Sequence, residues 1–270
     1  MTTIDPSAAA SPVLIERRGT TAILTLNRPA AMNALSVDLV AALDQALRDL
    51  RGAGAGGGIR ALVITGAGGK AFCAGADLKE RRAMSLHDTR RFLNSLNAAV
   101  DAVAAFPAPV IAAINGVAFG GGFELALACD IRLCADTTEL GLVEVRLGII
   151  PGAGGTQRLS RLAGVGVAKE LILTGRRIDA AQARALRIVS TVHPADDLLG
   201  AAMTVAGEIA AGGPLAVAQA KRAIDGGLPL ALSDALAVER SCYEVVLTSE
   251  DREEGLAAFV EKRRPVFKGK

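Results

Sequence analysis

The sequence predicts an α/β fold, in which short apolar strands alternate with amphipathic helices over the first two-thirds of the chain. Hydrophobic residues make up 51% of the 270 positions and charged residues 21%, which is enough apolar material for a sizeable core. Beyond residue 196 only helical patterns remain. We therefore predict a main α/β unit over residues 13–200, a helical region over 201–270 and a flexible N-terminal stretch over 1–12.

The first elements are predicted from apolar spacing. Two strands are predicted at 14–17 and 21–26, with a turn between them at Gly19 and Thr20. Leucine and valine then recur at helical spacing, which predicts an amphipathic helix over 36–51. The next stretch, 52–58, is almost entirely glycine and alanine and predicts a flexible loop.

The same rules predict the later elements. Short buried strands are expected at 61–65, 110–114 and 131–135, and helices at 88–105 and 123–128. Four C-terminal helices, interrupted by glycine pairs and a proline, are expected at 198–211, 215–225, 230–247 and 253–262. Their leucine-rich faces favour packing against a neighbouring subunit.

Charge and composition argue against several classes of function. A net charge of +2 gives no reason to expect nucleic acid or an anionic membrane as partner. The scattered cysteines are typical of reduced, buried thiols in a cytoplasmic protein, and residues 1–12 lack a signal-peptide pattern. His87 and His193 occupy polar or loop stretches, which disfavours histidine-dependent hydrolases. No metal-ligand pattern is present, so we expect no metal site.

A glycine turn and two carboxylates stand out as candidates for chemistry. The tandem glycines 120–122 open a helix, and their N–H groups could stabilise a developing oxyanion, although a tight turn explains them equally well. Glu124 and Glu144 both lie in otherwise apolar segments, where burial and mutual repulsion can raise a pKa toward neutrality. A salt bridge from Glu144 to Arg146 or to another cation is the structural alternative. A separation of twenty residues does not show that the two carboxylates meet.

Three long segments carry a resemblance to a known family. They are AFCAGADLKE at 71–80, IAAINGVAFGGGFELALACD at 111–130 and GLVEVRLGIIPGAGGTQRL at 141–159. With shorter matches near residues 26–29 and 258–264, they resemble the crotonase superfamily, the enoyl-CoA hydratase/isomerase family, over nearly the whole chain past residue 12. The resemblance implies the ClpP/crotonase-like fold, a spiral of ββα units with a C-terminal helical region used for trimerisation, and homotrimers or homohexamers.

The resemblance also implies a coenzyme A thioester substrate and site residues for it. Glu124 and Glu144 would be catalytic, and the N–H groups of Ala76 and Gly121 would form the oxyanion hole. No separate cofactor is expected, because coenzyme A is part of the substrate. Positions expected to contact the substrate or its CoA moiety are Arg28, Ala30, Met32, Ala74, Gly75, Ala76, Asp77, Leu78, Lys79, Gly121, Gly152, Phe259 and Lys262.

Hydratases of this family have both carboxylates, whereas isomerases commonly keep only the second. The resemblance therefore implies an enoyl-CoA hydratase (hydro-lyase), which adds water reversibly and syn to trans-2-enoyl-CoA to give 3-hydroxyacyl-CoA. We expect Glu124 to act as base and Glu144 to protonate the α-carbon. Alternatives are an enoyl-CoA isomerase, a methylglutaconyl-CoA hydratase and a non-catalytic RNA-binding protein. The chain also resembles the AU-rich-RNA-binding methylglutaconyl-CoA hydratase group, in which RNA contact is attributed to a lysine-rich helix near the N-terminus. The corresponding helix here, at 36–51, contains no lysine, which argues against RNA binding. The acyl pocket wall is expected over residues 78–92 and in the C-terminal helices.

Overall fold

The computed structural model describes residues 11–52 and 58–270. The predicted flexible stretch over 1–12 and the predicted loop over 52–58 therefore lie mostly outside the described residues. The strands are β1 (Val13–Arg18), β2 (Thr21–Leu26), β3 (Ala61–Gly66), β4 (Ala71–Cys73), β5 (Val110–Ile114), β6 (Val117–Phe119), β7 (Ile131–Ala135), β8 (Glu139–Gly141), β9 (Ile178–Asp179) and β10 (Thr191–His193). The helices are α1 (Val37–Gly52), α2 (Leu78–Ala83), α3 (Leu86–Ala104), α4 (Gly121–Ala128), α5 (Gly155–Ala163), α6 (Val165–Thr174), α7 (Ala180–Ala185), α8 (Leu198–Ala210), α9 (Pro214–Gly227), α10 (Leu232–Leu247) and α11 (Glu250–Glu261), with 3-10 helices η2 (Pro29–Ala31) and η3 (Glu144–Leu147).

The strands form two sheets, and from β3 to β8 successive strands alternate between them. The larger sheet has the order β1-β2-β3-β5-β7-β10, and only its β1-β2 pair is antiparallel. The smaller sheet has the order β4-β6-β8-β9, and only its β8-β9 pair is antiparallel. From β3 to β8, a strand of the larger sheet is followed by one of the smaller sheet before the chain turns into a helix. The predicted α/β spiral of ββα units is thus confirmed.

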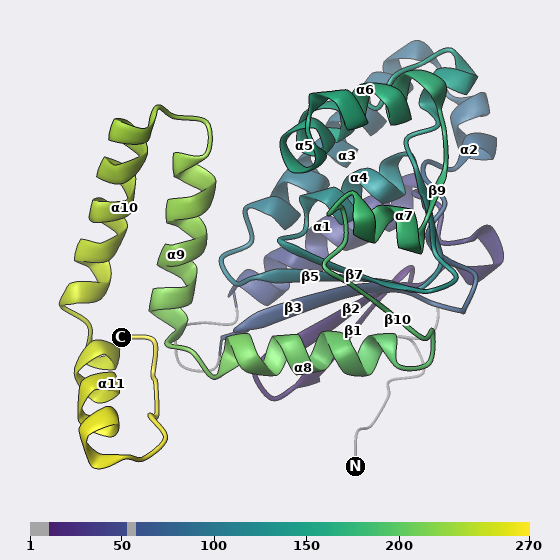
Figure 1. Ribbon diagram of the computed structural model, residues 1–270. Coiled ribbons are helices and arrows are strands. Elements are labelled where there is room, and N and C mark those ends of the chain that lie inside the picture. The colour runs from purple at the N-terminus through teal and green to yellow at the C-terminus, as the bar shows by residue number, and fades with distance from the viewer. Residues whose placement is uncertain (1–10, 53–57) are drawn as a thin grey trace.

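The inner strands of the larger sheet, β2, β3, β5 and β7, are buried on both faces, which explains their nearly continuous apolar runs. Along β3, Leu62 and Ile64 belong to the main core on the side of α1, α3 and α4. Val63 points the other way, into a second cluster. Leu198 and Ala202 of α8 complete that cluster, so α8 covers the opposite face of the sheet (Figure 1).

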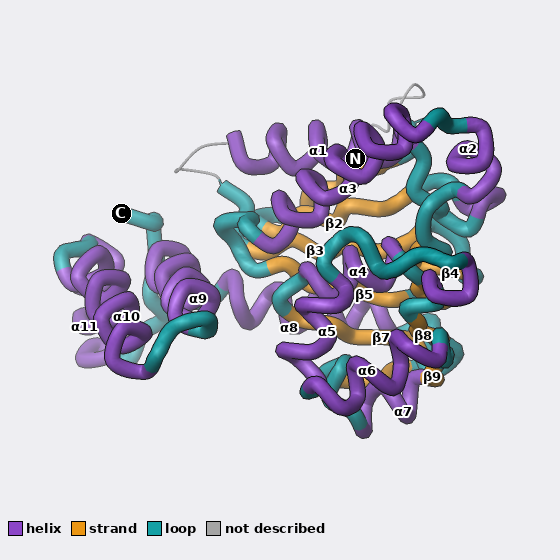
Figure 2. Tube along the Cα trace, turned by 90° about the horizontal axis from the view of Figure 1, so that it is seen from above, coloured by secondary structure: helices purple, strands orange, loops and turns teal. Residues whose placement is uncertain are grey.

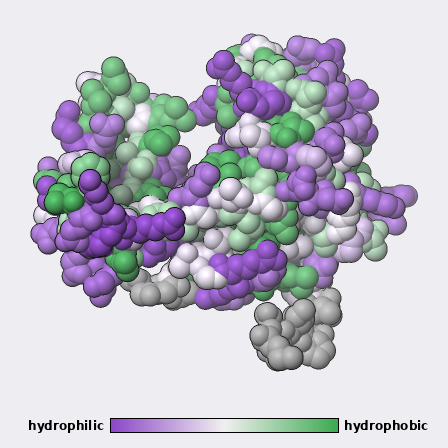
Figure 3. All heavy atoms as spheres, turned by 60° about the horizontal axis from the view of Figure 1, so that its bottom comes forward, coloured by the Kyte–Doolittle hydropathy of each residue, from purple (hydrophilic) through white to green (hydrophobic). Residues whose placement is uncertain are grey.

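The last three helices lie apart from the sheet, and α8 leads to them (Figures 1 and 2). An ion pair of 2.7 Å between Lys221 of α9 and Asp130 ties this group to the core. Large apolar side chains are exposed on it, among them Leu232 and Phe259, and hydrophobic atoms gather on this lobe in Figure 3. The helical C-terminal region is confirmed, whereas its use in trimerisation and the division at residue 200 stay predictions. No single helix of the described part of the chain is long and apolar enough to cross a membrane.

Several short elements were not predicted from the sequence. The strands β4, β6 and β8 have three residues each, which is too short for an alternating pattern to be recognised. The helices α2, α5, α6 and α7 were likewise not expected. The helix predicted from residue 88 begins at Leu86, because the hydroxyl of Ser85 accepts a hydrogen bond from the N–H of Asp88 and caps it.

Candidate active site

The fold brings Glu124 and Glu144 to one cavity of about 800 Å³. Its walls come from the loop after β4, from α2 and α3, from the start of α4, from η3 and from the loop before α5. Most of the other side chains in the lining are apolar. Six further residues predicted for the site line the same cavity: Ala74, Gly75, Ala76, Leu78, Gly121 and Gly152.

Two backbone loops approach each other at this cavity because glycines permit the approach. Gly75 has a φ of 96°, and a Cβ there would lie 2.8 Å from the carbonyl oxygen of Phe119. Gly120, with a φ of 49°, precedes α4 and leaves the N–H of Gly121 at the helix N-terminus. Within the described residues, neither Ala76 nor Gly121 donates its N–H to a backbone carbonyl. Both amides are therefore available to a ligand oxygen.

Glu124 is held rigidly at one oxygen and faces the cavity with the other. The side chain is 2% exposed, and its Oε1 accepts hydrogen bonds from the N–H groups of Ala153 (2.7 Å) and Gly155 (2.8 Å). Its Oε2 lies beside Gly121. Burial raises the pKa of Glu124, while the amides of Gly155 and Ala153 and the charge of Arg158 act in the opposite direction. The carboxylate is thus fixed in place and partly stabilised in its charged form.

Glu144 has no such support. It begins η3 and is 8% exposed, and among the described residues neither of its carboxyl oxygens has a hydrogen-bond partner. The alternative of a salt bridge to Arg146 is wrong, because that guanidinium binds the carbonyl of Thr174 instead. Burial, with a smaller contribution from the charge of Glu124, raises the pKa of Glu144 to about 7. Its carboxyl group also lies against Gly120, where a Cβ would be 3.1 Å from Oε1.

The remaining predicted residues fall into two groups. Arg28, Asp77 and Lys79 line a neighbouring surface cavity of about 520 Å³, and Arg28 and Asp77 form an ion pair of 3.0 Å. Ala30 lies in η2, and the carbonyl of Met32 accepts the N–H of Ala74, which places this segment beside the loop after β4. The other group, Phe259 and Lys262, lies on exposed α11 and the residue that ends it, apart from both cavities.

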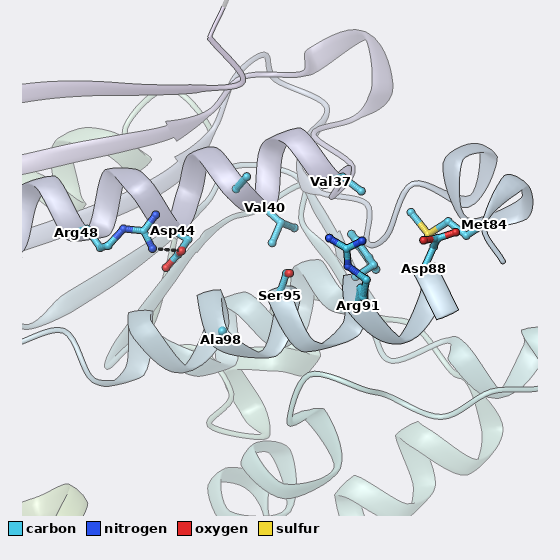
Figure 4. Close-up of a pocket in the computed structure, with 11 residues that line it drawn as sticks. Val37, Val40, Asp44, Arg48, Met84, Asp88, Arg91, Ser95 and Ala98 are labelled. Carbon is cyan, nitrogen blue, oxygen red and sulfur yellow. Dashed lines mark hydrogen bonds and ion pairs between the residues drawn. The ribbon is translucent and has the colours of Figure 1, made fainter. Parts of the chain in front are cut away.

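A third hollow lies between α1 and α3, and Figure 4 shows its lining. Its volume is about 510 Å³, and no buried carboxylate lines it. Arg48 forms an ion pair with Asp44, and the other charged residues of the lining are Asp88 and Arg91. The two positive and two negative side chains balance, so this groove offers no excess charge for phosphate groups.

Sequence patterns did not reveal the groups that hold Glu124. The N–H donors of Ala153 and Gly155 belong to the backbone, and the only signal for them was the glycine-rich stretch that leads into α5. His87 and His193 do not line the cavity, and His193 contacts the hydroxyl of Thr191. Within the described residues, no three His, Cys, Asp or Glu side chains are grouped so that they could hold a metal ion.

Comparison with known proteins identifies the family of this chain. The sequence model of the enoyl-CoA hydratase/isomerase family matches residues 16–270. The chain is 44% identical to enoyl-CoA hydratase domain-containing protein 2 of Mus musculus, over 100% of this chain and 91% of that protein. It is 43% identical to methylglutaconyl-CoA hydratase of Homo sapiens, over 94% of this chain and 75% of that protein. A crystal structure of enoyl-CoA hydratase from Bacillus anthracis superposes with a TM-score of 0.93 at 46% identity, covering 96% of this chain and 100% of that one. The chain therefore belongs to the enoyl-CoA hydratase/isomerase family of the crotonase superfamily.

Proposed function

We propose that this protein is an enoyl-CoA hydratase that adds water reversibly and syn across the double bond of a trans-2-enoyl-CoA. The observation that carries the proposal is one cavity lined by two buried carboxylates and by Ala76 and Gly121, whose amides have no backbone acceptor among the described residues. A carbonyl oxygen bound by both amides would be stabilised most strongly as an enolate, when it carries negative charge. The reaction needs no metal or separate cofactor, because coenzyme A is part of the substrate.

In the proposed mechanism, one water molecule is held between the two glutamates. Glu124 takes a proton from this water as the water oxygen bonds to the β-carbon. The π electrons move toward the thioester oxygen, where Ala76 and Gly121 hold the enolate. The carboxylic acid of Glu144 then gives its proton to the α-carbon, and a proton returned from Glu124 to Glu144 resets the site.

The surroundings of the two carboxyl groups support this division of labour. The two amides that bind Oε1 of Glu124 favour its ionised form, as a base requires. The unpartnered carboxyl group of Glu144 and its pKa of about 7 favour a neutral acid below that pH. Because the two groups interact, their titrations belong to the pair.

Hydration of crotonyl-CoA, followed as loss of the conjugated-thioester absorbance, tests the proposal. Glu124→Gln and Glu144→Gln should each lower kcat by roughly 10²–10⁴-fold. Glu139→Gln removes a half-exposed carboxylate on β8 outside the cavity and serves as the matched control. An undiminished rate in Glu144→Gln would refute the assignment. Faster conversion of a 3-enoyl-CoA to its 2-enoyl isomer than hydration would instead favour an isomerase.

A methylglutaconyl-CoA hydratase is the second candidate, and two arginines favour it. Leu78, Arg81 and Arg82 share one face of α2 and line the main cavity, whereas Lys79 and Glu80 line the surface cavity. Neither arginine forms an ion pair within the described residues, and the guanidinium of Arg81 lies 5.4 Å from the ring centre of Phe92. An acyl group ending in a carboxylate could pair with them.

Two substrates of equal size separate these candidates. Glutaconyl-CoA carries a terminal carboxylate, and 5-methyl-2-hexenoyl-CoA carries an uncharged isopropyl group in its place. A carboxylate-specific enzyme should prefer the first by roughly 10–100-fold in kcat/KM, as expected for a charge-assisted hydrogen bond at a partly exposed site. Arg81→Gln should remove the preference, and Arg90→Gln, outside the cavity lining on α3, should preserve it. Equal rates on both substrates would eliminate the second candidate.

We also propose that the protein forms a homotrimer or homohexamer through its C-terminal helices. The exposed apolar side chains of α10 and α11, such as Leu232 and Phe259, would then be covered by another subunit. Light scattering coupled to size-exclusion chromatography tests this directly. Leu232→Glu should shift the mass toward the monomer, and a monomeric mass for the unsubstituted protein would overturn the proposal.

A further inference from the structure

One side chain fixes the loop that binds Glu124. Nη1 of Arg158 donates a hydrogen bond of 2.9 Å to the carbonyl of Ala153, and Nη2 donates one of 2.7 Å to Oδ1 of Asp101 on α3. The loop also turns through Gly154, whose φ is 94° and whose missing Cβ leaves room for the guanidinium. Arg158 therefore connects the loop of residues 152–155 to α3.

The same loop supplies both hydrogen bonds to Glu124. Ala153 uses its carbonyl to bind Arg158 and its N–H to bind Oε1 of Glu124. Gly155, the first residue of α5, supplies the second N–H. A shift of this loop would therefore move the amides and the carboxylate that they hold. Displacement of a catalytic group by about 1 Å can cost on the order of 10²-fold in rate.

We propose that Arg158 is a positioning residue for Glu124: it holds residues 152–155 so that their amides keep the carboxylate in place and aimed at the water. The inference rests on the proposed hydratase function and deepens it. Arg158 does not line the cavity, so it acts through the loop and through its charge. Its side chain is 24% exposed and that of Asp101 is 71% exposed, so most of the effect is expected from the arginine itself.

The direction of the pH effect follows from the groups around Glu124. Glu144 of η3 faces it, Arg158 comes from α5, and α2 contributes Arg81 and Arg82 to the same cavity. The α3 side contributes Asp101 bound to Arg158, and the adjoining strands β4 and β6 contain no charged residue. Arg158 lowers the pKa of Glu124, against the larger effect of burial. Without this arginine, the base should lose its proton only at higher pH.

The test compares four variants of the full-length protein. Arg158→Gln should lower kcat for crotonyl-CoA by roughly 10–100-fold, leave KM within about 2-fold and move the acid limb of the kcat profile to higher pH. Arg158→Lys keeps the positive charge but cannot bind both the carbonyl of Ala153 and Asp101 as the guanidinium does. Compared with Arg158→Gln, it should therefore return the acid limb closer to its original pH while recovering less of the lost kcat. Asp101→Asn should have a smaller effect. Arg161→Gln is the matched control and should match the unsubstituted protein, because among the described residues this arginine of α5 binds only Gln157.

A second measurement does not depend on catalysis. Carbon-13 NMR of labelled glutamate carboxyls, with the Glu124 signal identified by its loss in Glu124→Gln, should show a higher pKa in Arg158→Gln. An unchanged Glu124 titration and acid limb, with loss only of folded protein on thermal unfolding, would assign Arg158 a purely structural role and overturn the inference. If Arg158→Gln does not fold, an Arg158→Lys protein with unchanged kcat and pH profile overturns it equally. Failure of the unsubstituted protein to hydrate any enoyl-CoA would refute the hydratase proposal, while the NMR titration would still decide the role of Arg158.

Discussion

Replacing Glu144 with glutamine should stabilise the free protein at alkaline pH, although it removes a proposed catalytic group. The carboxyl oxygens of Glu144 have no partner among the described residues, and the side chain is 8% exposed. Burial raises its pKa from 4.5 to about 7, with a smaller contribution from Glu124. Burying the ionised carboxylate of Glu144 without a partner lowers the free energy of unfolding. Glutamine has no charge and therefore avoids this cost.

The size and sign of this cost follow from the pKa shift. A pKa raised from 4.5 to about 7 corresponds to a cost on the order of 3 kcal/mol. Between these pH values the folded protein keeps the proton that the unfolded chain releases, so the free energy of unfolding falls as the pH rises. The cost is therefore complete above pH 7 and absent well below pH 4.5. The stabilisation by Glu144→Gln should grow by about 2–3 kcal/mol between pH 5 and pH 9.

Urea unfolding, followed by circular dichroism at pH 5 and pH 9 and at one protein concentration, measures this difference. Glu208→Gln, which removes an exposed carboxylate on α8, controls for the change in net charge. The control should show less than about 0.5 kcal/mol of change at either pH. A difference between Glu144→Gln and the unsubstituted protein that does not vary with pH would refute the reasoning.

Three further outcomes are expected. The kcat profile for crotonyl-CoA should fall on its alkaline side near pH 7, as Glu144 loses its proton, and a rate that still rises beyond pH 9 would contradict that role. Gly122→Ala should destabilise the fold by about 3 kcal/mol or more in urea unfolding, because the new methyl group would overlap the backbone carbonyl of Cys73; a loss below about 1 kcal/mol would contradict this packing. Gly120 has a φ of 49°, and a Cβ there would lie 3.1 Å from Oε1 of Glu144. Gly120→Ala should therefore lower kcat/KM by at least about 10-fold and the free energy of unfolding by about 1–3 kcal/mol. Unchanged kinetics would contradict this close approach.

The strands of the larger sheet were predictable because burial on both faces leaves a strong sequence signal. Residues 61–65 and 110–114 are apolar in nearly every position, and the structure shows them as the central strands β3 and β5. The smaller sheet left no such signal, because strands of two or three residues cannot show a period. The pairing of these short strands depends on how the longer helices and strands pack. A short stretch of sequence does not contain this long-range information.

In the site, likewise, the catalytic side chains could be predicted from the sequence, whereas the backbone contacts around them could not. Glu124 and Glu144 could be identified because a carboxylate in an apolar segment is costly and requires an explanation. Their different surroundings could not be read from the sequence, since Glu124 is held by the amides of Ala153 and Gly155, and any residue other than proline carries an amide. The unpartnered state of Glu144 was equally hidden, because Arg146, two residues away, pairs elsewhere. Burial raises the pKa of both carboxyl groups, but only Glu124 has backbone amides that favour its charged form. We infer that this difference allows Glu124 to serve as base and Glu144 as acid.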